Sequence, residues 1–287
     1  MTMNLSSKIK SSIEDFIDNS PDNSLKNKNN EKAFESLLIG FSSGNDDLYR
    51  FFKKDIGVFY WEPVEIFTKK FPNLKVSPDE LTVISWVLPQ TEVTKSDNRK
   101  TSRYPAERWV RARTYGEEFN DRIRKYVMSI LQKSGYSAVA PVLAPDWKWN
   151  TSKRYGFASS WSERHAAFVS GLGTFGLCDG LITPLGKAMR CGSVISNIKM
   201  IPTKRKYKER DEYCLFFSKG LCGKCIERCP VSAITIKGHD KIKCEKYLNV
   251  IKKYVNENFG FEGYACGLCQ TRVPCESKIP TETDLRY

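Results

Sequence analysis

The sequence predicts an α+β protein in which an α/β domain is followed by a small cysteine-rich domain. Three observations support this prediction. The apolar run over residues 81–88 has the length and composition of a buried strand. Apolar residues recur at helical spacing over residues 118–135, and a second strand-like run follows at 137–143, which is the strand, helix, strand order of an α/β sheet. Eight of the ten cysteines stand in the last quarter of the chain. We therefore expect an N-terminal segment over 1–75, an α/β domain over 76–202 and a cysteine-rich domain over 203–287.

The N-terminal segment is expected to be helical and to pack on the core. Ile9, Ile13, Phe16 and Ile17 have the spacing of one helix face, and the polar stretch 19–30 after them predicts a loop. The predicted helices cover residues 5–18, 31–39, 46–54 and 64–70.

The polar stretch 90–103 predicts a loop between the strand at 81–88 and the long helix, which Gly135 closes. Further along, Ser162 is expected to cap a helix that stops at Gly171. Strands are then predicted over 177–182 and 189–198, joined as a hairpin by residues 183–187.

Length and charge limit the possible functions. A chain of 287 residues with 40% hydrophobic content can bury a large core, and no apolar run reaches the roughly 20 residues needed to cross a bilayer. The N-terminus has neither an apolar signal core nor a twin-arginine pair, so we expect a cytoplasmic protein without membrane contact. The formal charge of +13 favours polyanionic partners such as tRNA. The densest basic run, 199–210, is interpreted as a solvated linker, with a nucleic-acid contact as the alternative.

The cysteine spacing points to two iron–sulfur clusters. The run Cys222-Gly-Lys-Cys225-Ile-Glu-Arg-Cys229-Pro230 keeps the last three ligands of the C-x2-C-x2-C-x3-C-P motif of bacterial ferredoxins, and Cys214 precedes it by eight positions. In that motif the fourth cysteine ligates the other cluster. The expected ligands are Cys214, Cys222, Cys225 and Cys275 for cluster A, and Cys229, Cys244, Cys266 and Cys269 for cluster B.

Two other uses of these cysteines are weaker. Disulfides are disfavoured because a cytosol keeps thiols reduced. A zinc site built from the pairs Cys222/Cys225 and Cys266/Cys269 would leave four cysteines unexplained. Cys178 and Cys191 fall outside the eight-ligand pattern and are predicted to be small apolar fillers.

The glycines at 171, 173 and 176 do not predict a dinucleotide site, since they follow a helix, whereas the dinucleotide fingerprint follows a strand and opens a helix. His165, inside the helix before them, is interpreted as a structural histidine. His239 is expected to be solvated in a loop.

Several of these features together resemble the cobalamin-dependent epoxyqueuosine reductases, which in turn resemble the catalytic core of reductive dehalogenases. They are Glu163-Arg164, Ala167, the block Gly171-Leu-Gly-Thr-Phe-Gly176, the following hairpin, and two cluster motifs that close with Cys266-x2-Cys269-Gln270. The likeness runs from about residue 81 to residue 275. It implies a nitroreductase-like α/β corrinoid-binding domain followed by a ferredoxin-like domain with two [4Fe–4S] clusters.

The resemblance also implies an activity. Electrons from a ferredoxin- or flavodoxin-type donor would pass through both clusters to cobalamin, for reductive removal of oxygen or another leaving group from a small organic substrate or a modified tRNA. Cobalamin would be bound base-off. The residues expected to contact it are Ser159, Ser160, Gly171, Gly173, Thr174, Phe175 and Gly176.

The chain departs from this family at the expected proton donor, because residues 156–160 contain no carboxylate. Tyr155 and Tyr104 are the candidate catalytic acids, and Arg154 is expected to lower the pKa of a neighbouring phenol; Tyr115 and Arg103 belong to the same set. Two alternatives stay open. One is an iron–sulfur electron-transfer or corrinoid-reactivating protein without a substrate of its own, and the other, weaker one is a flavin in place of cobalamin.

Overall fold

A four-stranded antiparallel sheet lies at the centre of the computed structural model, which describes residues 5–285. The strand order is β1 (Leu38–Ser43), β2 (Thr82–Pro89), β8 (Met189–Ser196) and β3 (Ala138–Val139). Both β2 and β3 pair antiparallel with β8, so they run in the same direction with β8 inserted between them. The predicted mixed α/β fold is confirmed.

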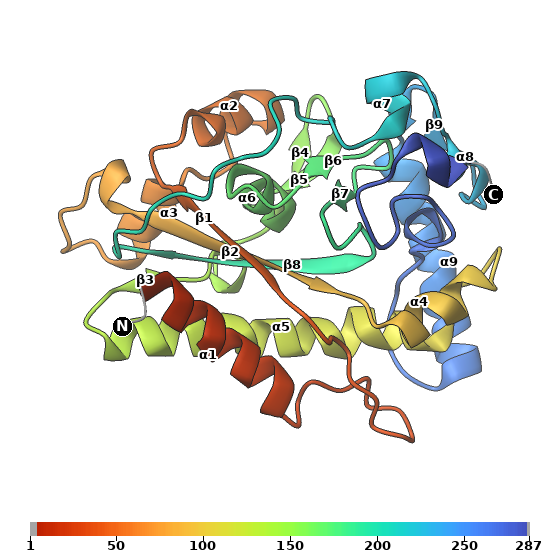
Figure 1. Ribbon diagram of the computed structural model, residues 1–287, viewed down its shortest axis with the longest axis horizontal. Coiled ribbons are helices and arrows are strands. Elements are labelled where there is room, and N and C mark those ends of the chain that lie inside the picture. The colour runs from red at the N-terminus through yellow and green to blue at the C-terminus, as the bar shows by residue number, and fades with distance from the viewer. Residues whose placement is uncertain (1–4, 286–287) are drawn as a thin grey trace.

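Helices cover both faces of this sheet (Figure 1). Helices α1 (Leu5–Asn19) and α5 (Glu107–Lys133) pack on one face, and α2 (Asp47–Ile56), α3 (Pro63–Lys70) and α6 (Glu163–Val169) lie on the other. Strand β2 alternates between them, because successive side chains of a strand point to opposite faces. Ile84 and Trp86 belong to the core under α1 and α5, whereas Val83 and Val87 belong to the opposite core.

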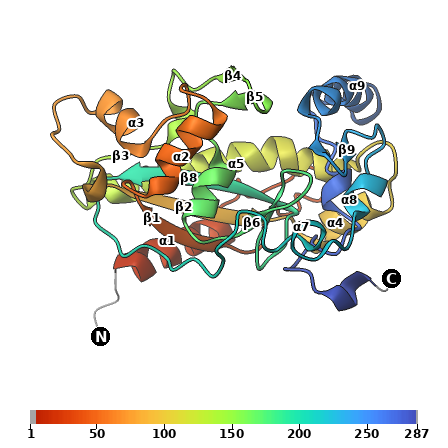
Figure 2. The same ribbon diagram turned by 90° about the horizontal axis from the view of Figure 1, so that it is seen from above.

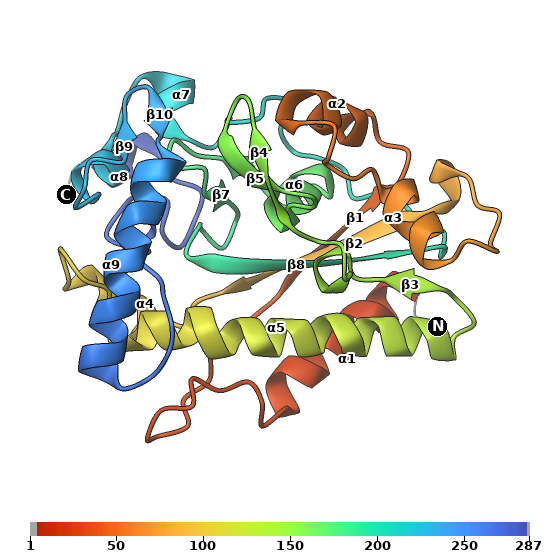
Figure 3. The ribbon, with the colours of Figure 1, turned by 180° about the vertical axis from the view of Figure 1, so that it is seen from behind.

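The cysteine-rich part gathers at one end of the sheet (Figure 2). Its elements are α7 (Leu215–Lys219), α8 (Lys224–Glu227), β9 (Ile234–Thr235), β10 (Gly238–His239) and α9 (Lys241–Phe259). Helix α9 crosses the first turns of α5 (Figure 3), where Ile251 and Val255 pack with Trp109 and Val110. None of the helices within residues 5–285 is long and apolar enough to cross a membrane.

Two short hairpins link the sheet to this end. Strands β4 (Trp149–Ser152) and β5 (Gly156–Ser159) form one, and β6 (Thr174–Phe175) and β7 (Leu181–Ile182) form the other. The predicted pairing of 177–182 with 189–198 is wrong: β7 pairs with β6, and β8 enters the central sheet.

The structure corrects two predictions about element type. The helix predicted over 31–39 is wrong, because Phe34 bridges to Gln90 and the chain then enters β1, which pairs along β2. The loop predicted over 90–103 contains helix α4 (Glu92–Arg99), whose first turn is capped by Thr91 Oγ1 accepting a hydrogen bond from the backbone N–H of Thr94. Strand pairing decided the conformation after residue 34, and the Thr91 cap allowed a helix at 92–99, although the local composition suggested otherwise.

Other elements differ from the predictions in length. Helix α5 begins at Glu107 instead of 118 and ends near Gly135 as expected. The strand predicted over 137–143 is reduced to β3, since a short 3-10 turn follows at Pro141. The helices predicted at 5–18, 46–54 and 64–70 are confirmed as α1, α2 and α3, and the capped helix after Ser162 as α6.

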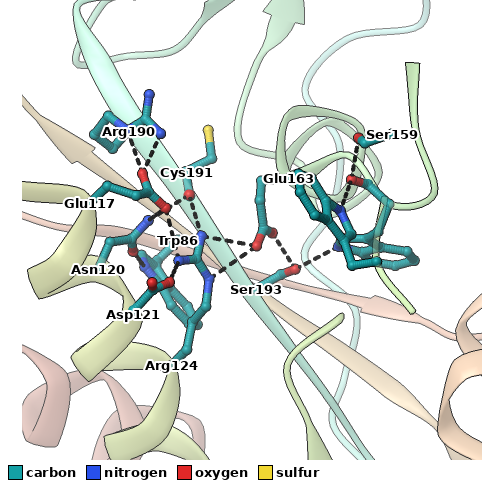
Figure 4. A network of polar contacts seen from close by, with 12 residues as sticks. Trp86, Glu117, Asn120, Asp121, Arg124, Ser159, Glu163, Arg190, Cys191 and Ser193 are labelled. Atoms are coloured by element: carbon teal, nitrogen blue, oxygen red, sulfur yellow. Dashed lines mark hydrogen bonds and ion pairs between the residues drawn. The ribbon is translucent and has the colours of Figure 1, made fainter. Parts of the chain in front are cut away.

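A buried guanidinium joins α5, α6 and β8 (Figure 4). The Arg124 side chain is 1% exposed. Its nitrogens contact Glu163 Oε1 at 3.0 Å and Glu117 Oε1 at 2.9 Å, and they also pair with Asp121. Its Nη2 donates a further hydrogen bond to the Cys191 carbonyl of β8 at 3.2 Å. Every side of this buried cation is therefore paired, as its desolvation requires.

The same network extends along β8. The Ser193 hydroxyl donates to Glu163 and accepts a hydrogen bond from Trp161 Nε1 at 3.0 Å. Burial alone would raise the pKa of Glu117, but the guanidinium groups of Arg190, Arg124 and Arg113 outweigh burial and lower its pKa to about 2. Glu117 is thus ionised at neutral pH.

Replacing Arg124 with methionine should strongly destabilise the protein, because it leaves buried carboxylates without their cation. We expect the free energy of unfolding to fall by about 3–5 kcal/mol. The matched control is Arg122→Met, which lies on the same helix and removes a solvent-exposed pair with Asp22; it should cost about 0–1 kcal/mol. Denaturant titration of both variants measures the difference, and equal losses would contradict the importance of the buried network.

Candidate active site and cysteine groups

A cavity of about 70 Å³ lies between the β4–β5 hairpin, α6 and the start of α9. Its wall is partly aromatic and partly polar. The polar and charged side chains that line it are Tyr60, Tyr155, Ser159, Ser162, Arg164, His165, Asp179, Arg210 and Lys241. These residues come from both the sheet domain and the cysteine-rich end.

The cavity carries an excess of positive charge. Arg164, in the first turn of α6, donates a hydrogen bond to the Asp179 carbonyl. The Arg210 guanidinium lies over the Phe175 ring at 4.7 Å, and Lys241 Nζ lies 4.9 Å from the centre of the Tyr155 ring. Three cations thus face one lining carboxylate, Asp179, so the site favours a ligand with negative charge or carbonyl oxygens.

The basic run at 199–210 contributes directly to this site. It was predicted to be a solvated linker, but Arg210 lines the cavity and Arg205 pairs with Asp46 of the α2 cap at 2.7 Å. The backbone N–H of Thr203 also donates to the Phe41 carbonyl of β1. The segment is therefore held along the sheet domain.

Tyr155 is held by a carboxylate from α2. Its hydroxyl donates to Asp55 Oδ2 at 2.6 Å, and Arg154 pairs with the same carboxylate. Burial and the Asp55 carboxylate raise the pKa of Tyr155 to about 12, although Arg210 and Arg154 oppose the shift. Arg154 lowers the pKa of this phenol as expected, but burial and Asp55 outweigh that effect. Tyr155 is therefore a neutral phenol that retains its proton.

The two histidines differ in protonation. His165 lies between the rings of Phe52 and Phe175, with centroids 4.5 and 4.7 Å away, and its Nδ1 is 2.8 Å from Ser162 Oγ. Burial and the nearby Arg210 lower its pKa well below the usual value, so it is neutral. His239, predicted to be solvated, instead contacts Asp179 Oδ2 through Nδ1 at 3.2 Å. Burial opposes its protonation, but Asp179 and Cys244 raise the pKa of His239 to about 9.

The residues expected to contact cobalamin separate into two groups. Ser159 and Phe175 line the cavity, whereas Ser160, Gly171, Gly173, Thr174 and Gly176 do not. Gly173 is required for packing, because a Cβ there would lie 2.2 Å from the Ile182 carbonyl oxygen of β7. Tyr104 is also remote from the lining; its ring stacks on Tyr254 of α9 with centroids 4.0 Å apart.

The cysteines form two neighbouring groups. Cys214, Cys225 and Cys275 share a buried cluster that also contains Cys178. Cys244 and Cys229 lie near Cys266, and Cys229 also packs against the first cluster. Cys269 lies between the groups, near both Cys178 and Cys266. Cys222 is exposed in the turn between α7 and α8.

This donor set fits iron–sulfur clusters. All ten cysteines are free thiols. Within residues 5–285, no three or more Cys, His, Asp or Glu side chains are arranged around a single-ion site. A [4Fe–4S] cube is larger than one ion and takes a thiolate at each iron corner, and the two groups supply sulfur donors. Cys178 was predicted to be an apolar filler, but it lies among the expected ligands of cluster A.

The cavity fits cobalamin in chemistry and not in volume. Cationic and hydroxyl side chains suit the amide and phosphate groups of the cofactor. Pockets for ligands much smaller than a corrinoid occupy roughly 300–1,000 Å³, whereas this cavity measures about 70 Å³. A corrin ring therefore does not enter while the β4–β5 hairpin keeps this position.

The fold is similar to the folds of two solved reductase structures. A crystal structure of a selenomethionine-labelled epoxyqueuosine reductase aligns with 97% of this chain and 69% of its own, at a TM-score of 0.51 and 15% identity. A catabolic reductive dehalogenase in complex with 3-bromo-4-hydroxybenzoic acid aligns with 86% of this chain and 31% of its own, at a TM-score of 0.54 and 17% identity.

Part of the chain is similar in sequence to epoxyqueuosine reductases. The chain is 31% identical to that of Bacillus cereus over 119 residues, which are 39% of this chain and 29% of the relative. It is 31% identical to that of Staphylococcus aureus over 129 residues, 43% of this chain and 32% of the relative. The matches thus span about a third of these relatives, and no family model matches the chain. The resemblance expected from the sequence is confirmed.

Sequence patterns identified Tyr155 and Arg154 but missed Asp55, Arg210 and Lys241. These three belong to α2, the basic segment and α9, which are far apart in the chain. Only tertiary packing brings Arg210 and Lys241 to the cavity and Asp55 to the Tyr155 hydroxyl.

Replacing Asp55 with asparagine should lower the pKa of Tyr155 from about 12 toward the ordinary value of about 10, because the carboxylate that disfavours the phenolate is removed. Nuclear magnetic resonance of ring-labelled tyrosine, assigned with Tyr155→Phe, follows this titration. Asp47→Asn, an exposed change on the same helix, is the control and should leave Tyr155 unchanged. An unmoved Tyr155 pKa in Asp55→Asn would refute the pairing.

Proposed function

We propose that the chain is an iron–sulfur oxidoreductase of the epoxyqueuosine reductase type, which removes oxygen or another leaving group from an organic substrate. The observation that carries the proposal is the position of the cationic cavity against the cysteine-rich end. The relatives named epoxyqueuosine reductase support the reaction class. The two [4Fe–4S] clusters would supply electrons, through the ligand sets Cys214, Cys222, Cys225, Cys275 and Cys229, Cys244, Cys266, Cys269.

Cluster B is proposed to be the one nearer the cavity. Cys244 lies one turn beyond Lys241 on α9, and its sulfur is close to His239. His239 contacts Asp179, which lines the cavity. Only two side chains thus separate an expected cluster ligand from the site.

The chain's own residues have distinct proposed roles at the site. Arg164, Arg210 and Lys241 would bind the electron-rich part of a ligand. Tyr155 keeps its proton at neutral pH and would donate it to a leaving group, with Asp55 orienting the hydroxyl. The buried Tyr60 hydroxyl has no well-formed hydrogen bond within residues 5–285, although the backbone N–H of Ser162 is nearby, so it offers a further polar contact.

Base-off cobalamin is the proposed cofactor at this cavity, and its binding would require the β4–β5 hairpin to move away from α9. The electron donor is proposed to be a ferredoxin or flavodoxin. The net charge of +13 supports a modified tRNA as substrate beside small organic molecules.

One observation favours a second function. The small volume of the cavity suits a protein that passes electrons to a partner and binds no corrin or substrate of its own. Such a protein would still assemble both clusters. The two functions therefore differ in cofactor binding and not in iron content.

Anaerobically reconstituted protein should contain about eight irons per chain, because two four-iron clusters are expected. After addition of cob(II)alamin, electron paramagnetic resonance should show a five-coordinate, base-off signal beside two reduced clusters. The cobalamin spectrum without protein is the control. About four irons per chain would contradict the two clusters. Eight irons with cobalamin left base-on would contradict the reductase and favour electron transfer, and absorbance from a bound isoalloxazine would identify a flavin protein.

A further inference from the structure

A lysine is buried among the cysteine sulfurs. Lys187 is 3% exposed, and its Nζ lies 3.3 Å from Cys178 Sγ. The thiols of Cys275, Cys225 and Cys269 are its other close charge partners. Within residues 5–285 its ammonium forms no ion pair with a carboxylate. Glu276, near in sequence to Cys275, is already paired with Arg99.

The backbone holds Lys187 at this place. Gly186 has φ +79°, and a Cβ there would lie 2.0 Å from the Glu276 carbonyl oxygen. The next residue, Lys187, donates its backbone N–H to the Cys275 carbonyl at 2.9 Å. The turn between β7 and β8 is thus pressed against the segment that carries Cys275, and the lysine side chain cannot reach solvent without breaking this contact.

A buried ammonium needs an anionic partner, because removing it from water costs several kcal/mol. The sulfur of Cys178, which accepts the lysine hydrogen bond, is one such partner. A [4Fe–4S] cluster with four thiolates carries net negative charge, and reduction adds one more electron. A fixed cation beside it stabilises the reduced cluster more than the oxidised one.

We propose that Lys187 is a positioning residue for cluster A, which compensates the cluster's charge and raises its reduction potential. The inference rests on the proposed iron–sulfur clusters and adds a named residue that controls one of them. Cys178, which receives the lysine hydrogen bond, lies between this ammonium and the expected ligands Cys225 and Cys269. Cluster A should feel the charge more than cluster B, since two of its expected ligands, Cys275 and Cys225, are close to Lys187, against one of cluster B.

The test is a redox titration followed by electron paramagnetic resonance. Wild-type protein, Lys187→Met and Lys187→Arg are compared with Lys224→Met. Lys224 is next to Cys225 in the chain, but its ammonium is solvent-exposed and paired with Glu227, so the control removes the same charge where water screens it. Lys187→Met should shift one cluster to a more negative potential, Lys187→Arg should stay closer to wild type, and Lys224→Met should shift little.

Assembly of the variants is checked by iron content. Loss of iron in Lys187→Met with retention in Lys187→Arg would support the need for the charge. If both variants lose iron, the proposal is tested on wild-type protein labelled with nitrogen-15 at the lysine ε-position. Pulsed resonance of the reduced clusters should then show a nitrogen-15 coupling, and its absence would overturn the proposal.

An unchanged potential in an assembled Lys187→Met protein would also overturn it. Failure of the proposed function would give a different result, because the wild-type protein itself would then lack the two clusters.

Discussion

The buried Arg124 guanidinium is the constraint on which the site depends. A cation with 1% exposure must be surrounded by anions and carbonyl oxygens, and α5 alone supplies only Glu117 and Asp121. Glu163, the first residue of α6, completes the set, so the start of α6 is fixed against α5 and β8. The next residues, Arg164 and His165, consequently face the cavity. The two adjacent residues therefore have different positions. The Glu163 carboxylate pairs with Arg124 inside the fold, and the Arg164 guanidinium lines the cavity.

A second constraint comes from charge. The cavity places Arg164, Arg210 and Lys241 around one carboxylate, and burial lowers the pKa of Lys241 while Asp179 opposes that change. Such an arrangement places like charges close together. A ligand with negative groups offsets these charges, and binding would stabilise the native state in proportion to its affinity. The charge of Lys187 is likewise expected to be compensated by a negatively charged group, in this case the proposed cluster with its cysteine ligands.

Much of the fold followed from local patterns, and the exceptions have tertiary causes. Periodicity was sufficient for α1, α2, α3 and α6, because each buries one apolar stripe. The helix prediction for residues 31–39 was wrong because strand pairing with β2 decided their conformation. Helix α9 was not predicted, because its apolar stripe is weak. Cysteine spacing suggested two sets of cluster ligands, and these sets stay a prediction. Asp55 could not be found this way, because its contact with Tyr155 spans 100 residues of the chain. Lys187 is near Cys178 in sequence, but its contact with the Cys275 backbone joins distant segments.

The β4–β5 hairpin is held by α2 on one side, through Ser152 and Tyr155, and only weakly by α9 on the other. Its contacts with α9 are thin: Gly156 approaches Ile242, which is 53% exposed, and Lys241 Nζ donates to the Phe157 carbonyl at 3.4 Å. Trp149 at its outer edge is 61% exposed. The central sheet, in contrast, is fixed by two apolar cores and the Arg124 network. Regions with few buried contacts open at the lowest free energy. The α9 side of the hairpin is therefore the less firmly held wall of the cavity, whereas its α2 side is fixed by buried and partly buried hydrogen bonds.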